Sequence, residues 1–242
     1  MKGEWLYRFI AIYNIMRKKL AVVLILVGVF ILALPFLSNL MLEKKESSID
    51  VDAIPKTKLE QNAERGNKSY DQSKVKPIDI NGVILNRDKA DLNMVIGQMT
   101  IPSINKNIAI FDGLENNSLM YGACTMKPHQ KMGTGNYAIA GHYCRKDNVL
   151  FGGLFNIKKG DIIKLTNKKN IYEYEVVNMF KTSDTRTDLI GDGLANHGNG
   201  KAMVSLMTCY KNEEGYRYFV VGTFKKLYPY SESKMLEGIT DK

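Results

Sequence analysis

A run of 18 residues without a charge constrains this chain more than any other feature. The run, LAVVLILVGVFILALPFL, covers residues 20–37, and the apolar LML at 40–42 lengthens it. At a helical rise of about 1.5 Å per residue it extends over roughly 27 to 34 Å, close to the hydrocarbon thickness of a bilayer. A cleaved signal peptide has a shorter apolar core, about 7 to 15 residues, and a small-residue cleavage site that we do not find. We predict an uncleaved transmembrane anchor over residues 20–42.

Basic residues gather on one side of the predicted anchor. Arg17, Lys18 and Lys19 precede it directly, whereas the EKKE at 43–46 is balanced in charge. The positive-inside rule therefore places residues 1–19 in the cytoplasm and the chain after the anchor outside the cell. The aromatic and aliphatic stretch 5–16 suggests an amphipathic helix in the inner interface. The pattern predicts a single-pass protein of the cell membrane with an extracellular domain.

The net charge of +9 has an explanation that does not involve nucleic acid. Residues 1–19 hold five Lys and Arg against one Glu, which accounts for +4 and leaves +5 for the exported part. A positive exported part suits an anionic cell envelope, and we find no zinc-finger spacing or RNA-binding signature. Nucleic acid is therefore not an expected partner.

The exported part divides into a polar segment and a folded domain. Residues 43–77 are polar, nearly free of aromatic residues and without a sustained period, which predicts a flexible stalk with some helix around 59–65. We expect a catalytic domain at 78–229, followed by a C-terminal tail at 230–242. No second apolar span follows the domain, so the C-terminus is not expected to be anchored.

The folded domain shows short β-like runs separated by Gly, Asn, Asp and Lys turns. Many short strands within about 150 residues favour a closed or nearly closed antiparallel barrel or a sandwich. Short helices are expected around 117–121 and 151–156, and NKKN at 167–170 is typical of a hairpin turn. The predicted strands cover residues 94–101, 108–111, 137–141, 161–166, 172–180, 202–209 and 217–224.

One cysteine lies where a strand ends. In AMVSLMTCY alternate side chains face opposite ways, so Met203, Ser205, Met207 and Cys209 share one face. Because Arg217 opens the returning strand only eight positions later, it is expected near Cys209. A neighbouring cation favours the thiolate, which is the nucleophilic form of cysteine, and a guanidinium can also bind an oxyanion. Arg cannot give up its proton, so another group must protonate a leaving amine.

Three histidines could supply that proton. His142 in NYAIAGHYC follows a predicted strand and a glycine, which places it at a strand end and makes it the favoured candidate. His129 lies in a Lys/Pro/Gln turn and His197 in the loop GDGLANHGNG, where solvated histidines are expected. On placement alone both remain candidates.

These residues resemble those of a known family. SLMTC at 205–209 resembles the TLxTC signature of sortases, the cysteine transpeptidases that anchor proteins to the Gram-positive cell wall. YAIAGHY resembles the strand that carries the family's histidine, and RYFVVGTF the strand that carries its arginine. IGQMTIPSINKNIAIFDG and GTGN are similar to its opening strands and to the turn before the histidine. The resemblance runs from about residue 96 to 224 and keeps the family's order of His, Cys and Arg.

The resemblance implies a fold and a role for each site residue. The fold would be all-β, a closed eight-stranded sortase-type barrel with short helices, preceded by the N-terminal transmembrane helix. Cys209 would be the nucleophile, His142 the general acid and base, and Arg217 the stabiliser of oxyanion and substrate. The sorting motif would bind beside residues of the histidine strand and the signature, namely Ala140, Met207 and Thr208. Ser205 replaces the signature's first threonine and keeps a hydroxyl.

The resemblance also implies a reaction. Cys209 would attack the Thr–Gly bond of an LPxTG-like sorting signal on a secreted protein, and a cell-wall precursor amine would resolve the thioacyl enzyme. The N-terminal anchor and the lack of a C-terminal span look most like class A, while class D or E, or a pilus-related sortase, remain alternatives. No cofactor is expected. Calcium binds some class A members through loop carboxylates, but the loop at 178–201, with Asp184, Asp188 and Asp192, offers no site that we can assign.

Three other interpretations remain open at this point. A zinc site could use Cys124, His129, His142, Cys144 and Cys209, but no CxxC pair exists and the spacing matches no zinc pattern. A papain-like hydrolase would have its cysteine before its histidine. A non-catalytic envelope module would have no reason to keep these three residues at strand ends. Cys124 and Cys144 are expected to be packing residues, with a disulfide between them the less favoured reading.

Overall fold

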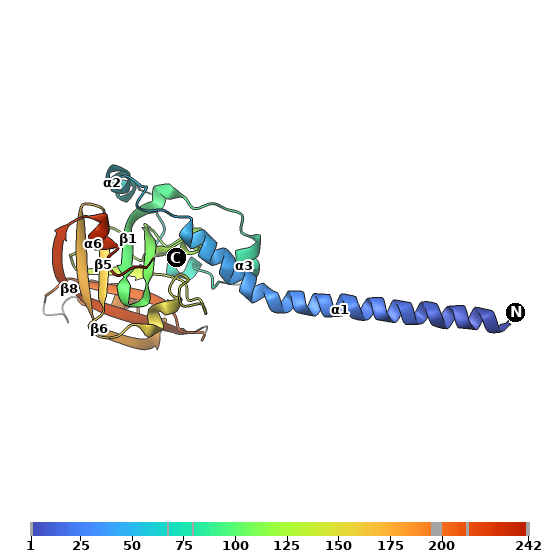
Figure 1. Ribbon diagram of the computed structural model, residues 1–242. Coiled ribbons are helices and arrows are strands. Elements are labelled where there is room, and N and C mark those ends of the chain that lie inside the picture. The colour runs from blue at the N-terminus through green and yellow to red at the C-terminus, as the bar shows by residue number, and fades with distance from the viewer. Residues whose placement is uncertain (1, 67, 79, 195–199, 212, 241–242) are drawn as a thin grey trace.

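The protein forms a β-barrel from which one long helix projects (Figure 1). In the computed structural model, residues 2–66, 68–78, 80–194, 200–211 and 213–240 are described. The helix, α1, runs from Lys2 to Ser47 and contains one stretch, Tyr13–Ser47, long and apolar enough to cross a membrane. In the described part of the chain, no residue in the most apolar part of that stretch is buried.

Eight strands close into the barrel in the order β1-β2-β3-β4-β7-β8-β6-β5, and β5 pairs with β1. Two neighbouring pairs are parallel, β2 with β3 and β4 with β7, and the others are antiparallel. The closed eight-stranded barrel expected from the resemblance is therefore confirmed. The strands are β1 (Val95–Ile101), β2 (Lys106–Phe111), β3 (Ala123–Thr125), β4 (Asn136–Ala140), β5 (Ile162–Thr166), β6 (Asn170–Ser183), β7 (Met203–Cys209) and β8 (Tyr216–Pro229).

Alternation along the strands divides the apolar residues between two clusters. Tyr137, Ile139, Val204 and Leu206 belong to the main cluster inside the barrel. Their neighbours Ala138 and Ala140 belong to a second cluster, against which Met207 packs. A two-residue period makes this division necessary, because successive side chains point to opposite faces. The face that carries Ala140 and Met207 also carries the candidate site.

Short helices connect and cover the strands. Two of them, α4 (Asn116–Leu119) and the 3-10 helix η4 (Gly152–Asn156), lie where the sequence predicted helices. A third, α2, overlaps the helix expected around 59–65 and begins three residues earlier, and the remaining helices were not predicted. The bounds of these helices are α2 (Lys56–Glu64), then α3 (Ile80–Leu85), α6 (Glu232–Met235) and the 3-10 helices η1 (Gln72–Lys74), η2 (Leu92–Met94), η3 (Pro102–Ile104) and η5 (Thr187–Ile190).

The segment 43–77 differs from the predicted flexible stalk, because it is packed on the barrel. Leu59 of α2 is buried, and the buried amide of Asn62 donates to the Val95 carbonyl oxygen at 2.7 Å. Val51 and Ile54 are buried in the same cluster. These isolated apolar residues in a polar segment follow no period, so the sequence does not show that they reach a core.

The C-terminal end of α1 is fixed to the barrel by buried contacts. Glu46 and Lys106 form an ion pair of 2.9 Å with both side chains almost fully buried, and the Leu150 amide donates to the Glu46 carboxylate at 2.8 Å. Leu42, one turn earlier, is buried in the barrel core. The helix and the barrel therefore meet in a packed joint. The helix predicted to lie flat over residues 5–16 is instead continuous with α1.

Residues 230–240, the described part of the expected tail at 230–242, are likewise part of the fold. Met235 of α6 is fully buried, and its carbonyl oxygen accepts a hydrogen bond of 3.0 Å from the Thr100 hydroxyl on β1. Ser231 caps this short helix by accepting from the Lys234 amide. The compact unit therefore extends beyond the predicted limits of 78 and 229 at both ends.

Candidate functional site

Strand register brings three of the predicted site residues to one rim. On β7 and β8, Cys209 is the direct antiparallel partner of Arg217. On β4 and β7, which are parallel, Ala140 pairs with Met207, and the Gly141 amide continues the ladder by donating to the Met207 carbonyl oxygen at 3.0 Å. His142 follows directly. His142 is two residues after Ala140 and Cys209 is two residues after Met207, so both follow the same paired position of the two strands.

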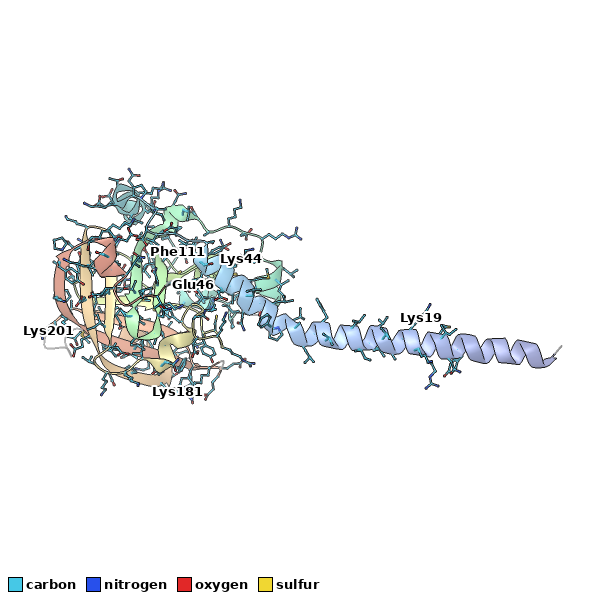
Figure 2. The ribbon with its side chains drawn as sticks, viewed as in Figure 1. Lys19, Lys44, Glu46, Phe111, Lys181 and Lys201 are labelled. Atoms are coloured by element: carbon cyan, nitrogen blue, oxygen red, sulfur yellow. The ribbon has the colours of Figure 1, made fainter. Side chains whose placement is uncertain are left out.

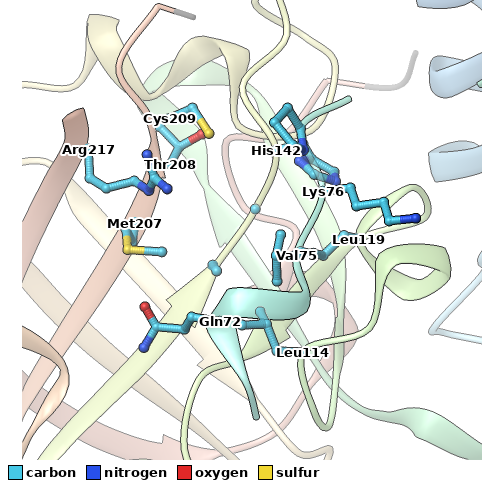
Figure 3. Close-up of a pocket in the computed structure, with 13 residues that line it drawn as sticks. Gln72, Val75, Lys76, Leu114, Leu119, His142, Met207, Thr208, Cys209 and Arg217 are labelled. Carbon is cyan, nitrogen blue, oxygen red and sulfur yellow. The ribbon is translucent and has the colours of Figure 1, made fainter. Parts of the chain in front are cut away.

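Cys209, His142 and Arg217 line one pocket, which Figure 3 shows. In that view Cys209 lies between His142 and Arg217. Ala140, Met207 and Thr208, predicted to bind substrate, are part of the same lining. The Thr208 hydroxyl is buried and has no hydrogen-bond partner within the described chain. The rest of the pocket is formed by Gln72, Val75, Lys76, Pro77, Leu114, Leu119 and Gly141.

His142 is held by close packing of its backbone. Its carbonyl oxygen accepts a hydrogen bond of 3.0 Å from the Phe151 amide. The preceding Gly141 is required here, because a Cβ at that position would lie 2.6 Å from the Phe151 ring. Only 6% of the His142 surface is exposed, and this burial lowers the pKa of its imidazole from 6.5 to about 4. The imidazole is therefore neutral at pH 7.

Cys209 is the accessible cysteine of the chain. It is half-buried at the rim, whereas Cys124 and Cys144 are buried, and all three are free thiols. Burial raises the pKa of the Cys144 thiol to about 12 and also raises that of Cys124. Those two thiols stay protonated and out of reach, in agreement with the predicted packing role. The less favoured disulfide between them is not formed.

Arg217 is oriented by two oxygen atoms. Its guanidinium donates to the Tyr216 carbonyl oxygen at 3.0 Å and lies 3.6 Å from the Asp184 carboxylate. Asp184 is placed beyond the end of β6, and its amide donates to the Gly215 carbonyl oxygen in the turn before β8. The sequence singled out Asp184 only as a loop carboxylate. Pairing of β6 with β8, which no local motif reveals, brings it to the arginine.

The residues that directly follow His142, Cys209 and Arg217 belong to one aromatic cluster around Phe155 of η4. The Phe155 ring stacks on Tyr218 at 4.3 Å between centroids and makes edge contacts with Tyr143 at 5.4 Å and Tyr210 at 5.6 Å. Tyr143 follows His142, Tyr210 follows Cys209, and Tyr218 follows Arg217. One ring therefore contacts the backbone neighbours of all three site residues, which restrains the three strand ends relative to one another.

A short segment from the region predicted as a stalk borders the site. Residues 72–77, which we call the strap, supply Gln72, Val75, Lys76 and Pro77 to the pocket lining. Asn116 holds the strap at two points, since its carbonyl oxygen accepts from the Lys76 amide at 2.7 Å and its amide donates to the Lys74 carbonyl oxygen at 2.9 Å. Nothing in the polar sequence of the strap pointed to the site.

The other candidates do not gather here. His129 is exposed in a turn with a left-handed backbone, and His197 lies outside the described residues. Within the described chain no group of three or more His, Cys, Asp and Glu side chains could hold a metal ion. Asp188 is paired with Arg186, and Asp192 contacts Lys127. The zinc arrangement considered from the sequence is therefore not formed by the described residues.

The arrangement suits acyl transfer. A partly exposed thiol, an imidazole that can accept and return a proton, and a fixed guanidinium surround a pocket with an apolar floor from Leu114, Leu119 and Met207. A thiol with a neighbouring base is an activated nucleophile, and a preorganised donor stabilises the oxyanion of a tetrahedral intermediate. The strip of lining residues could take a short extended peptide with apolar side chains.

Comparisons with known proteins agree with this chemistry. The family model named Sortase domain matches residues 99–225. Sortase A of Listeria monocytogenes is 30% identical over 212 residues, 87% of this chain and 92% of the relative, and Sortase A of Streptococcus agalactiae is 32% identical over 219 residues, 88% and 86% respectively. The solved structure of the Listeria monocytogenes sortase A is similar at a TM-score of 0.55 with 32% identity, covering 62% of this chain and 99% of that one.

Proposed function

The chain belongs to the sortase family of cysteine transpeptidases and is class A-like, and we propose that Cys209, His142 and Arg217 carry its reaction. The observation that supports this most is that strand pairing brings Cys209 opposite Arg217 and Ala140 opposite Met207, so that His142, Cys209 and Arg217 line one pocket. The proposed substrate is a secreted protein that bears a C-terminal LPxTG-like sorting signal. The proposed acceptor is an amine of a peptidoglycan precursor.

In the first half of the proposed reaction the Cys209 sulfur attacks the Thr carbonyl carbon of the Thr–Gly bond. His142, whose buried imidazole is neutral, takes the thiol proton. A tetrahedral intermediate forms, and its oxyanion is stabilised by the Arg217 guanidinium. When the C–N bond breaks, His142 gives the proton to the departing glycine amine and the acyl group remains on sulfur.

The second half reverses these roles. The acceptor amine attacks the thioester carbon, and His142 removes a proton from that amine. The C–S bond then breaks, the new amide is released, and the proton returns to the Cys209 sulfur. The pocket residues Ala140, Met207 and Thr208 are proposed to position the sorting motif, with the unpartnered Thr208 hydroxyl as a polar atom beside the nucleophile.

We also propose that α1 anchors the enzyme in the cell membrane with residues 1–19 in the cytoplasm. The supporting observations are the exposed apolar stretch of α1 and the basic residues directly before it. In this orientation the barrel is outside the cell, where sorting signals and wall precursors are found. No cofactor enters the proposed reaction.

The full chain in detergent micelles, incubated with an LPxTG-type peptide, tests the proposal. With a triglycine amine present we expect a Leu-Pro-x-Thr-triglycine product, and without it slow hydrolysis between Thr and Gly. Cys209→Ala should lose at least about a thousandfold in turnover while its circular dichroism is unchanged, because the half-buried rim residue contributes little to the core. A peptide left intact by the natural chain, or still cleaved by Cys209→Ala, would refute the assignment.

A further inference from the structure

The barrel meets α1 at the level where the helix leaves the bilayer. A hydrocarbon core of about 30 Å corresponds to about 20 helical residues, so an anchor that begins at Leu20 emerges near Asn39. The two faces of α1 differ at that point. Ser38, Leu42 and Glu46 are buried against the rest of the protein, whereas Phe36 and Leu40 are 73% and 51% exposed. One face is therefore held by the barrel while the other remains open at the membrane surface.

Next to the open face lies a hollow with an apolar side and a cationic side. Phe36, Asn39 and Leu40 of α1 line it together with Arg145 and Lys146, and its volume is about 300 Å³. Lys146 forms an ion pair of 2.6 Å with Glu43. Arg145 is exposed and has no hydrogen bond or ion pair within the described residues. A free guanidinium above two exposed apolar side chains matches an amphiphile with an anionic head.

The loop that carries Arg145 is fixed at this height. Besides Lys146, Asn148 donates to the Glu43 carboxylate at 2.8 Å, and the Leu150 amide donates to Glu46 at 2.8 Å. Glu46 is itself paired with the buried Lys106. Two consecutive turns of α1 thus hold the loop 145–150, so the barrel cannot swing Arg145 away from the membrane without breaking buried bonds.

A third exposed apolar residue belongs to a helix that packs beside α1. The short helix α3 packs beside α1, where Figure 1 shows it at the base of the barrel next to the emerging helix. Its Val83 is fully buried, yet Leu85 is 74% exposed. We call Phe36, Leu40, Leu85, Arg145 and Lys146 the membrane base. Protein surfaces that lie in the membrane–water interface combine exposed Leu and Phe with Arg and Lys.

We infer that the membrane base rests on the outer leaflet and that Arg145 binds the phosphate of an anionic phospholipid, whose acyl chains continue along Phe36 and Leu40. Arg is suited to this role because its fork of donors matches phosphate oxygens and is more weakly hydrated than an ammonium. The inference depends on membrane insertion of α1 and not on the proposed catalytic residues. A bound lipid would also steady the loop that begins three residues after His142.

Lipid retention by the full chain tests this inference. The protein is reconstituted in nanodiscs containing equal amounts of phosphatidylcholine and phosphatidylglycerol, extracted with mild detergent, and weighed by native mass spectrometry. We expect one retained phosphatidylglycerol on the natural chain and at least fivefold less on Arg145→Glu and Arg145→Ala, with Arg145→Lys in between. Lys201→Glu is the matched control, because Lys201 is also an exposed cation and the substitution changes the charge by the same amount as Arg145→Glu. Figure 2 shows Lys201 on the side of the barrel away from α1.

Two readouts keep the result interpretable. Hydrogen exchange of residues 143–149 should be slower in discs with phosphatidylglycerol than in discs of phosphatidylcholine alone, and Arg145→Glu should remove that difference. Circular dichroism establishes that each variant is folded, and Arg145→Ala serves if Arg145→Glu is not. Equal retention by the natural chain and by the Arg145 variants, or equal retention of the two lipids, would overturn the inference. Peptide cleavage plays no part in these measurements, so they stand or fall separately from the proposed reaction.

Discussion

Cys209 and Arg217 face each other as direct partners across β7 and β8, although a turn of seven residues separates them along the chain. An antiparallel register places directly opposed side chains on the same face of the sheet. Strand pairing therefore brings Arg217 beside Cys209, and both residues line the same pocket. The second member of the rim, His142, comes from a parallel neighbour on the other side of β7.

Arg217→Lys should reduce kcat/KM by about 10² to 10³, because a point charge on a flexible stem does not reproduce the planar donors that face the oxyanion. Steady-state cleavage of a sorting peptide measures the loss. Asp184→Asn is the companion variant, since Asp184 lies 3.6 Å from the guanidinium and is not one of the residues that line the pocket. We expect it to cost less than tenfold. Equal rates for Arg and Lys at 217 would rule out the oxyanion role.

Phe155→Leu should lower kcat by about tenfold to a hundredfold while KM changes little. The reason is positional, since the ring contacts the neighbours of all three site residues and misplacement by about 1 Å costs that much. Phe180→Leu is a suitable control, because Phe180 stacks on the Phe219 ring and, among the described residues, makes no ring contact with those three tyrosines. If Phe155→Leu and Phe180→Leu affected kcat equally, the cluster would be only a packing feature.

The lowered pKa of His142 predicts that the stability of the fold decreases at low pH. Burial holds its pKa at about 4 in the folded protein, below the 6.5 of the exposed group. The unfolded chain therefore binds this proton more readily between these values, so stability is fully present above about pH 6.5 and falls as the pH drops towards 4. The loss attributable to this residue amounts to about 3 kcal/mol.

Two measurements check that expectation. In Cys209→Ala, the proton resonances of the His142 ring should titrate with a midpoint near 4, and urea unfolding of the natural chain should lose stability between pH 6.5 and pH 4.5. His142→Gln should reduce the pH dependence in that interval. A midpoint at 6 or above would mean that the imidazole is not desolvated in solution.

Lys106→Met should destabilise the barrel by about 3 to 5 kcal/mol, because it leaves the buried Glu46 carboxylate without its cationic partner. Urea unfolding of the full chain in micelles, followed by near-ultraviolet circular dichroism, gives the value. Lys106→Met combined with Glu46→Gln should recover part of the loss, since no buried charge then remains. Additive losses from the two changes would argue against a coupled pair.

The barrel and its rim were largely predictable from local sequence. Apolar content and flanking turn residues identify strands such as Met203–Cys209 and Val95–Ile101 in the sequence. Their predicted bounds fall within a few residues of those observed. The three-residue β3 was missed, because Ala123–Thr125 is too short for a period to appear. That His142 is next to Cys209 follows from a parallel pairing between distant strands. The family resemblance anticipated this pairing, whereas the spacing of the residues alone left three histidines open.

The parts that could not be predicted depend on tertiary contacts with weak local signals. The polar segment 43–77 carries single apolar residues, such as Leu59, whose burial depends on contacts with strand residues of the barrel. Glu46 and Lys106 lie 60 residues apart and become a buried pair only when α1 docks. The aromatic cluster around Phe155 also arises from four separate segments. Composition averages over such positions, and for this reason the sequence predicts a flexible segment where the structure has a packed one.

Trapping the acyl-enzyme tests the central claim most directly. The full chain is incubated with an LPxTG-type peptide in the absence of an added amine, quenched in acid, digested and analysed by mass spectrometry. The account predicts a Leu-Pro-x-Thr acyl adduct on the peptide that contains Cys209, removed by hydroxylamine and absent in Cys209→Ala, with Cys124 and Cys144 unmodified. An adduct on another residue, or cleavage between Thr and Gly that proceeds without any adduct on Cys209, would contradict it.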